Sequence, residues 1–391
     1  MKLRLCIVSF KECWPDERGD WYSYGGFPLQ VSAVASLFDD TTLLIVRGPR
    51  RPGGIKIEGM SRVVALHSPK GADLRRKISV AARLPYYAGI IARYVRKADV
   101  VHVPVPGDIP LLGMLIALVL RKRLIARYGS SWITTSQTTL VHRFTRGCMR
   151  LFAGGRNVML ATGEGVDAPA TRMQWVFSTA LSRPELEQIR PRIDRGLSSP
   201  VRLVYAGRLS SEKGVAVLID ALALLKRERE SLVPQLTLVG DGPEKATLQA
   251  QVAALGLGDS VCFAGHCDRA ALSAHLHRAD ICVQPSLSEG FSKAWLDAMA
   301  HGLPVTASRV GAAAAVIGDG GERGWLVPPG NVDALAAALR AAITTPRDWA
   351  ELRHRCRAYV ESRTLEAWAQ RIGDICRRQW NIEMVGGKLH A

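Results

Sequence analysis

Two acidic residues stand eight positions apart in SEGFSKAWLDAMAHGLPV, which runs from Ser288 to Val305. Glu289 precedes a glycine and an aromatic residue, and Asp297 lies in the helical pattern that follows. An ionised carboxylate only accepts hydrogen bonds, so Glu289 suits the hydroxyl groups of a sugar. Asp297 has an ordinary alternative, because an i,i+4 ion pair with Lys293 is a common surface feature of helices.

A second loop, AGRLSSEKG, places Arg208 and Lys213 between a strand-like run and an amphipathic helix. Arginine can hold phosphate oxygens in a fork, and lysine adds a point charge. The first amides of the helix after Glu289, at Phe291 and Ser292, favour the same kind of anion. These groups predict a diphosphate site, although a loop with solvated cations would explain Arg208 and Lys213 equally well.

Glycines mark two further strand-end loops. Gly25 and Gly26 precede a helix-like apolar run, and Gly240 begins the Gly-Asp-Gly-Pro turn after another strand-like run. Glycine lets the backbone approach a ligand closely. A flexible loop and a plain turn are the alternatives at these two places.

The elements that must position these loops alternate between apolar strands and helical segments. This alternation is typical of parallel sheets with helices on both faces, and it occurs twice. Ligands of such sheets bind beyond the carboxyl ends of the strands. We therefore expect an α/β fold with two doubly wound, Rossmann-like domains facing a central cleft. The expected strands are 3–10, 42–47, 100–105, 123–128, 158–162, 201–206, 235–239, 260–264, 281–285 and 304–307.

The domain boundary is expected in PELEQIRPRIDRGLSSP, which is polar and flanked by prolines. This gives an N-terminal domain over 1–183, a linker over 184–200 and a C-terminal domain over 201–363. Residues 364–391 are expected to form a C-terminal helix that packs back on the N-terminal domain.

Composition excludes several classes. The eight cysteines form no CxxC pair, so a zinc site is not expected. We expect reduced thiols in a cytosolic protein instead. The N-terminus does not have the pattern of a signal peptide. The apolar run PLLGMLIALVL is too short to span a bilayer, which needs about 20 residues, so we expect a buried helix over 110–120.

The net charge of +17 is unevenly distributed. Residues 1–183 hold 27 Lys and Arg against 12 Asp and Glu, whereas residues 184–391 hold 25 against 23. An excess of this kind favours an anionic partner: a phospholipid surface, a phosphorylated substrate or nucleic acid. Aromatic residues are only 6% and no recognition motif is present, so nucleic acid is not expected.

One basic segment suggests where an anionic membrane surface could bind. Residues 72–100 interleave cations with apolar residues, including Leu84, Tyr86 and Ile90, in an amphipathic pattern broken around Pro85. An ordinary helix with a solvated face is the alternative. The cations are Arg75, Arg76, Lys77, Arg83, Arg93, Arg96 and Lys97.

Together these residues resemble the retaining GT-B glycosyltransferases of family 4. The resemblance covers most of the chain and is strongest from Val201 to Leu339. Its motifs occur in the family's order: AGRLSSEKG, LVGDGPE, VCFAGH, ADICVQPSLSEGFSKAWLDAMAHGLPVTAS and GWLVPPGNVDALAAAL.

The resemblance implies a role for each residue. Glu289 would contact the donor sugar, Asp297 the ribose, and Arg208 and Lys213 the diphosphate, whose charge they would stabilise without a metal. No DxD triplet of the metal-binding kind is present. The implied catalytic residues are Arg208, Lys213 and Glu289. The other implied donor-binding residues are Gly25, Gly26, Gly207, Gly240, His266, Gly290, Phe291, Ser292, Lys293 and Asp297.

The sequence departs from the family pattern in three places. The second acid is Asp297 rather than glutamate, which shortens its reach. Ala312 and Ala315 stand where the family often has a glycine and a glutamate. The family's acceptor-side histidine has no assignable counterpart, because His102 is expected inside a strand as a packed core residue.

The resemblance implies transfer of a hexose-type sugar, with retention, from a nucleoside-diphosphate sugar to an acceptor. The expected acceptor is a lipid-linked or oligosaccharide precursor of a cell-surface polysaccharide. The expected location is the cytoplasm, peripherally on the inner face of the membrane. A nucleotide-sugar epimerase or hydrolase of the same fold and a non-catalytic sugar-nucleotide-binding protein remain alternatives.

Overall fold

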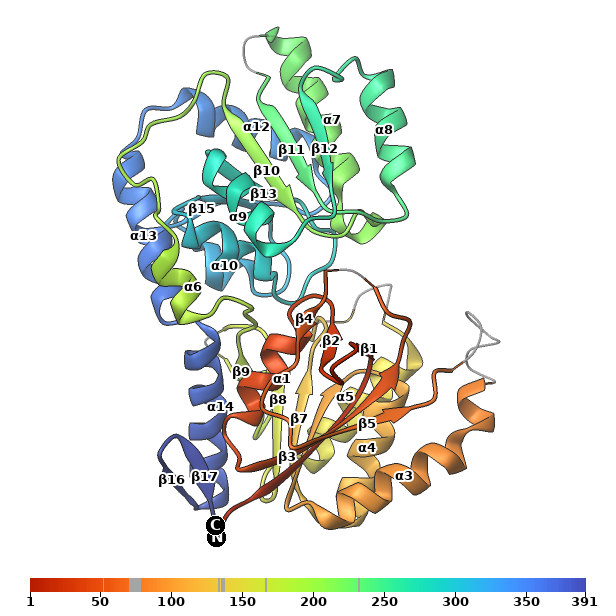
Figure 1. The fold of residues 1–391 in the computed structure, drawn as a ribbon. Helices are drawn as coiled ribbons and strands as arrows, with labels where there is room; N and C mark the ends of the chain where they lie inside the picture. Colours follow the sequence, from red (N-terminus) through yellow and green to blue (C-terminus); the bar gives the residue numbers. More distant parts are fainter. Residues whose placement is uncertain (52, 70–78, 133, 135–137, 166, 231–232) are drawn as a thin grey trace. The chain divides into compact units, whose positions relative to one another are not determined.

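The computed structural model describes the chain except for residues 52, 70–78, 133, 135–137, 166 and 231–232. The chain forms two compact units (Figure 1). Unit 1 comprises Met1–Ala180 and Leu365–Ala391, and unit 2 comprises Leu181–Thr364. The segment expected as a linker, 184–200, lies within unit 2.

Unit 1 is built on a sheet in the order β4-β2-β1-β6-β7-β8-β9, with β3 paired to β1 and β5 to β3. The short strands β2 and β4 pair antiparallel, and the others are parallel. The strands are β1 (Arg4–Pro15), β2 (Trp21–Ser23), β3 (Asp40–Arg47), β4 (Ile55–Lys56), β5 (Arg62–Leu66), β6 (Val100–Val105), β7 (Arg123–Tyr128), β8 (Asn157–Thr162) and β9 (Gln174–Val176).

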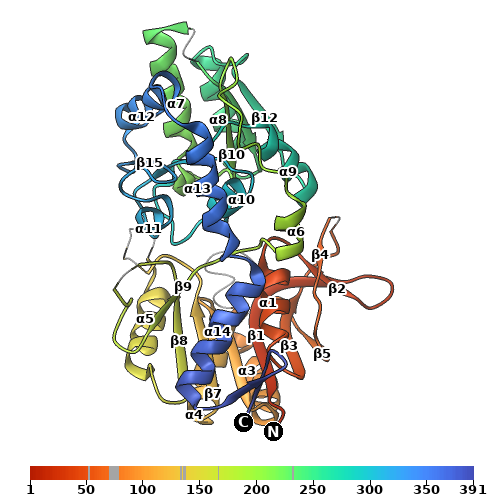
Figure 2. The same cartoon turned by 90° about the vertical axis from the view of Figure 1, so that its left-hand side faces the viewer.

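Helices cover the sheet of unit 1, and α14 comes from the far end of the chain (Figure 2). It packs against α1 and against β8 and β9, whereas α3 packs against α4. The two chain ends lie side by side, since the amino group of Met1 donates to the carbonyl of Ala391 (Figure 1). The elements are α1 (Phe27–Ala35), α3 (Leu84–Lys97), α4 (Asp108–Val119), α5 (Leu140–Phe152), α14 (Leu365–Trp380), β16 (Glu383–Val385) and β17 (Lys388–His390).

Unit 2 has a fully parallel sheet in the order β12-β11-β10-β13-β14-β15. The chain winds one way from β10 to β12 and the other way from β13 to β15. A crevice is therefore expected at the carboxyl ends of β10 and β13, where the winding reverses. The strands are β10 (Arg202–Ala206), β11 (Gln235–Val239), β12 (Val261–Gly265), β13 (Ile281–Gln284), β14 (Val305–Ser308) and β15 (Gly324–Val327).

The helices of unit 2 follow the strands in the order expected of a doubly wound domain. They are α6 (Arg183–Gln188), a 3-10 turn (Ser211–Lys213), α7 (Val215–Glu228), α8 (Lys245–Ala254), α9 (Arg269–Arg278), α10 (Lys293–Ala300), α11 (Ala313–Ile317), α12 (Val332–Thr344) and α13 (Trp349–Glu361).

All ten expected strands are present, because each is a continuous apolar run. The sheets bury most of them, whereas the edge strand β12 is only partly buried. The short strands β2, β4, β9 and β15 were missed, as was β5. In the segment expected as a C-terminal helix, α14 ends at Trp380 and the strands β16 and β17 follow, which were also missed. The apolar run 110–120 forms most of α4, whose Met114 and Ala117 are buried. Within the described ranges, no helix combines the length and apolar character needed to cross a membrane.

Candidate functional site

The loop after β10 lies against the loop after β13. Gly214 has φ +64°, and a Cβ there would lie 2.1 Å from the carbonyl oxygen of Pro285. Only glycine allows this approach. The amide of Leu287 donates to the carbonyl of Glu212 at 2.8 Å. The two loops that carry the predicted cations and the first predicted acid are therefore joined through their backbones.

Lys213 and Glu289 meet at this junction. The Nζ of Lys213 lies 2.6 Å from Oε2 of Glu289, and both side chains are largely buried. A cation predicted for the diphosphate and a carboxylate predicted for the sugar thus form one ion pair. A diphosphate beside Lys213 would place its attached sugar within reach of the Glu289 carboxylate.

The loop after β14 supports Glu289 from the other side. A Cβ on Gly311 would lie 2.2 Å from the carbonyl oxygen of Glu289, and the amide of Ala312 donates to the carbonyl of Gly290 at 2.9 Å. The side chain of Ala312 is buried. The departure at Ala312 therefore leaves the backbone support of the Glu289 loop in place. Gly311 is required for this close packing, and the sequence did not single it out.

A cavity of about 490 Å³ opens beside these loops in unit 2. Its floor is tight, because a Cβ on Gly240 would lie 1.8 Å from the carbonyl oxygen of Gly207. The structure brings five predicted residues to this cavity and adds Asp241 and Cys267, which the sequence did not single out. The lining residues are Ala206, Gly207, Arg208, Val239, Gly240, Asp241, His266, Cys267, Leu272, Ala294 and Asp297.

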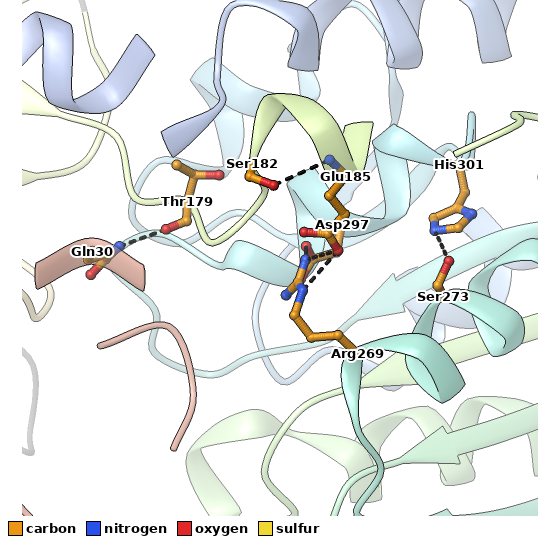
Figure 3. Close-up of polar contacts among 8 residues, drawn as sticks. All are labelled: Gln30, Thr179, Ser182, Glu185, Arg269, Ser273, Asp297 and His301. Atoms are coloured by element: carbon orange, nitrogen blue, oxygen red, sulfur yellow. Dashed lines mark hydrogen bonds and ion pairs between the residues drawn. The ribbon is translucent and has the colours of Figure 1, made fainter. Parts of the chain in front are cut away.

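Asp297 lines this cavity and pairs with Arg269 (Figure 3). The Arg269 guanidinium lies 3.2 Å from Oδ1 of Asp297 and 2.6 Å from Oε1 of Glu185. Burial alone would lower the pKa of Arg269, but Asp297 and Glu185 raise it above its ordinary value. Asp297 therefore presents its carboxylate to the cavity with one oxygen held by a permanent cation.

Glu185, Arg269 and Asp297 form a triad, and helix caps position Glu185 and Arg269 within it. Asp268 caps α9 by accepting from Ala271, which puts Arg269 in the first turn. Ser182 caps α6 by accepting from the amide of Glu185 at 3.3 Å. Serine followed three residues later by glutamate is a capping-box pattern, but here the glutamate side chain bonds Arg269. Sequence reading missed both residues.

A buried histidine lies close to the triad. His301 is 3.2 Å from the hydroxyl of Ser273, and both residues border a small pocket together with Arg269 and Asp297 (Figure 3). Burial, followed by the nearby positive groups of His277, Arg357 and Arg269, lowers its pKa to about 4. His301 is therefore neutral at physiological pH.

The remaining predicted residues divide into two groups. Lys293 begins α10, Ser292 is its N-cap, and Gly290 and Phe291 precede it. The ring of Phe291 packs on Trp295, so Phe291 offers only its backbone to a ligand. Gly25 and Gly26 precede α1 in unit 1, and their contact with a donor stays a prediction.

Two further expectations concern histidine and metal. His102 is buried, its Nδ1 lies 3.0 Å from the carbonyl of Ile125, and burial lowers its pKa to about 3, as expected of a core residue. Within the described part of the chain, no three His, Cys, Asp or Glu side chains are placed to hold a metal ion.

Solved structures with the same fold cover nearly the whole chain. Sucrose-phosphate synthase from Thermosynechococcus elongatus has a TM-score of 0.72 at 21% identity, over 97% of this chain and 100% of that chain. Anabaena HepE in complex with UDP has a TM-score of 0.69 at 19% identity, over 96% and 99%. The fold is therefore GT-B, with two Rossmann-like domains, as the resemblance predicted.

The match to a family model lies within unit 2. Residues 192–363, somewhat less than half of the chain, match the family model described as Glycosyl transferases group 1. Glycogen synthase from Mycobacterium tuberculosis is 33% identical over 196 residues, which are 50% of this chain and 42% of that protein. The chain spans between about two fifths and three fifths of the length of the curated relatives it matches. Glu185 lies outside the residues that the family model matches, whereas Arg269 and Asp297 lie within them.

Proposed function

We propose that the protein is a glycosyltransferase that moves a hexose-type sugar from a nucleoside-diphosphate sugar to an acceptor, with retention at the anomeric carbon. The observation that carries this proposal is the Lys213–Glu289 ion pair where the winding of the unit 2 sheet reverses. The match to glycosyl transferases group 1 over this unit and the UDP bound by HepE support it.

In this proposal, Arg208 and Lys213 stabilise the charge that develops on the departing diphosphate. The bond between the anomeric carbon and the phosphate oxygen breaks, and its electron pair stays on that oxygen. The acceptor hydroxyl attacks the same face, and its proton passes to the leaving phosphate. Glu289 holds the sugar through its hydroxyl groups, and Asp297 accepts from the ribose. No step requires a metal, so activity is expected to persist in a chelator.

We further propose that the acceptor is lipid-linked or an oligosaccharide precursor of a surface glycan. The protein would act in the cytoplasm and associate peripherally with the inner face of the membrane. The excess of cations in the first 183 residues supports this location.

The test is acceptor-dependent release of nucleoside diphosphate from a panel of sugar nucleotides mixed with membrane lipid extract. Wild-type protein should release it, and Arg208→Ala and Glu289→Ala should abolish release. Arg340→Ala is the matched control, because Arg340 forms a surface ion pair with Glu228 at the end of α7 that is remote from Lys213. This variant should retain full activity. Unchanged turnover in both site variants would refute the site, and release without an acceptor would favour a hydrolase.

A further inference from the structure

Helix α5 of unit 1 turns an apolar side toward solvent. It carries five of the ten large hydrophobic side chains that are exposed in the described part of the chain. At 100° per residue these five fall within an arc of about 120°. The buried Arg146 on the opposite side and the buried Met149 hold the helix on the protein. The exposed five are Leu140 (80%), Val141 (37%), Phe144 (54%), Leu151 (76%) and Phe152 (42%).

Helix α3 lies within the basic segment 72–100, for which the sequence predicted membrane binding. Unlike α5, it turns its apolar side toward the core. Its apolar stripe of Tyr87, Ile91 and Val95 is fully buried in the core, and Leu84 is its one large hydrophobic residue with substantial exposure. Of the seven cations expected on that segment, Arg75, Arg76 and Lys77 lie outside the described residues. The described part of α3 is thus an ordinary sheet-covering helix with solvated cations.

Along the sequence, the charges on either side of α5 are all positive over a long stretch. From Ile109 to Gly163 the sequence contains eight Lys and Arg and no Asp or Glu. On the helix itself, Arg143 and Arg150 are exposed, and they lie along one edge of the apolar arc. Cations flanking exposed leucine and phenylalanine complement a surface that is apolar inside and anionic at its boundary, which describes a bilayer of acidic phospholipids.

We propose that α5 is the element with which the protein docks on an anionic phospholipid bilayer. Phe144, Leu151 and their neighbours enter the boundary between headgroups and acyl chains, while Arg143 and Arg150 meet lipid phosphates. The proposal rests on the proposed membrane association and is independent of the donor site in unit 2.

The test is co-sedimentation of the full-length protein with vesicles of phosphatidylcholine, with and without phosphatidylglycerol, over a range of salt. Wild-type protein should bind the anionic vesicles and lose affinity as salt rises. The double variant Phe144→Ser with Leu151→Ser should lower the partition coefficient by about tenfold or more. Each substitution removes a large apolar group that would be buried in the bilayer on binding. Arg143→Gln should lower it by about fivefold.

The matched control is Leu84→Ser with Arg93→Gln on α3, which should cost less than the α5 double variant. Thermal unfolding and nucleoside-diphosphate binding without vesicles should be unchanged in all variants, since the substituted side chains are exposed. If the α5 variant binds anionic vesicles like the wild type while the α3 variant does not, the docking element is wrong and membrane association stands. If the wild type binds no vesicles, both fail, whatever the donor site does.

A second copy of the chain could also cover an apolar helix face. In that case the α5 double variant would change the molecular mass measured by light scattering and leave vesicle binding unaltered. That result would overturn the proposal and assign α5 to a contact between copies.

Discussion

Two cation–carboxylate pairs hold the two predicted acids of unit 2, and they are built differently. Lys213 and Glu289 belong to loops at neighbouring strand ends, and their pair has two members. Arg269 is the first residue of α9 and Asp297 lies within α10. A second carboxylate, that of Glu185, also pairs with the arginine and holds it in place. The first pair can exchange its partners for phosphate and sugar oxygens when a donor binds. The second pair is held in a fixed position. Substitutions of Glu289 and of Asp297 should therefore have different effects on activity and on nucleotide binding.

The largest effect is expected from Glu289→Gln. The amide keeps the shape but not the charge, so it should lower kcat/KM by about 10²–10³-fold, comparable to the loss of one preorganised electrostatic group. Binding of nucleoside diphosphate alone should change by less than about threefold, because the lost contact is to the sugar. Steady-state kinetics and calorimetry measure the two quantities. An equal loss in both would show that Glu289 supports the nucleotide rather than the sugar.

Asp297→Asn should give the reverse pattern. If Asp297 accepts from the ribose, loss of this charged acceptor should weaken nucleoside-diphosphate binding by about 10–100-fold, as for hydrogen bonds to charged groups. Turnover at saturating donor should fall much less. Asp297→Glu is the informative control, since it restores the length that the family pattern has. Unaltered nucleotide affinity in Asp297→Asn would mean that the acid is structural and serves only Arg269.

Acid should destabilise unit 2 through His301, which lies close to the second pair. Its folded pKa of about 4 lies below the ordinary value of 6.5, so the unfolded chain takes up the proton first as pH falls. The stability of unit 2 should therefore be constant above about pH 6.5 and decline toward pH 4, by about 2 kcal/mol from this group between pH 7.5 and 5.

Thermal unfolding of wild-type protein and His301→Gln across this range checks the expectation. The variant should show a shallower decline, because glutamine does not titrate and can still reach Ser273. His102 in unit 1 has the same sign of shift and contributes equally to both proteins, so the difference isolates His301. Parallel curves would exclude His301 as the titrating group.

The sequence predicted what is local or repeated and missed what is assembled by the fold. The strands were found because each is a run of consecutive apolar residues, and Arg208, Lys213 and Glu289 were found because they follow such runs. Edge strands such as β9, with three residues, carry too little pattern. The segment 184–200 was expected as a linker with at most a helical turn, and it contains most of α6. A short polar helix with prolines nearby has no apolar stripe that would predict its extent.

The triad could not be found from spacing. Glu185, Arg269 and Asp297 are separated by 84 and 28 positions, and only the packing of three helices brings them together. The Lys213–Glu289 pair was closer to prediction, because both residues follow strands of one sheet. What remained unknown was that β10 and β13 are neighbours, which depends on the strand order.

The smallest effect is expected from Glu185→Gln, and it sharpens the comparison most directly. Both ends of the Glu185–Arg269 pair are about one-third exposed, so its loss should cost less than about 1 kcal/mol of stability. If Glu185 only orients Arg269, nucleoside-diphosphate affinity should fall by about two- to fivefold, with kcat unchanged. Glu185→Asp should recover part of this loss. A fall in affinity as large as that of Asp297→Asn would instead mean that the carboxylate of Asp297 binds ribose only while Glu185 holds Arg269 in place. Glu185, Arg269 and Asp297 would then act together as one unit.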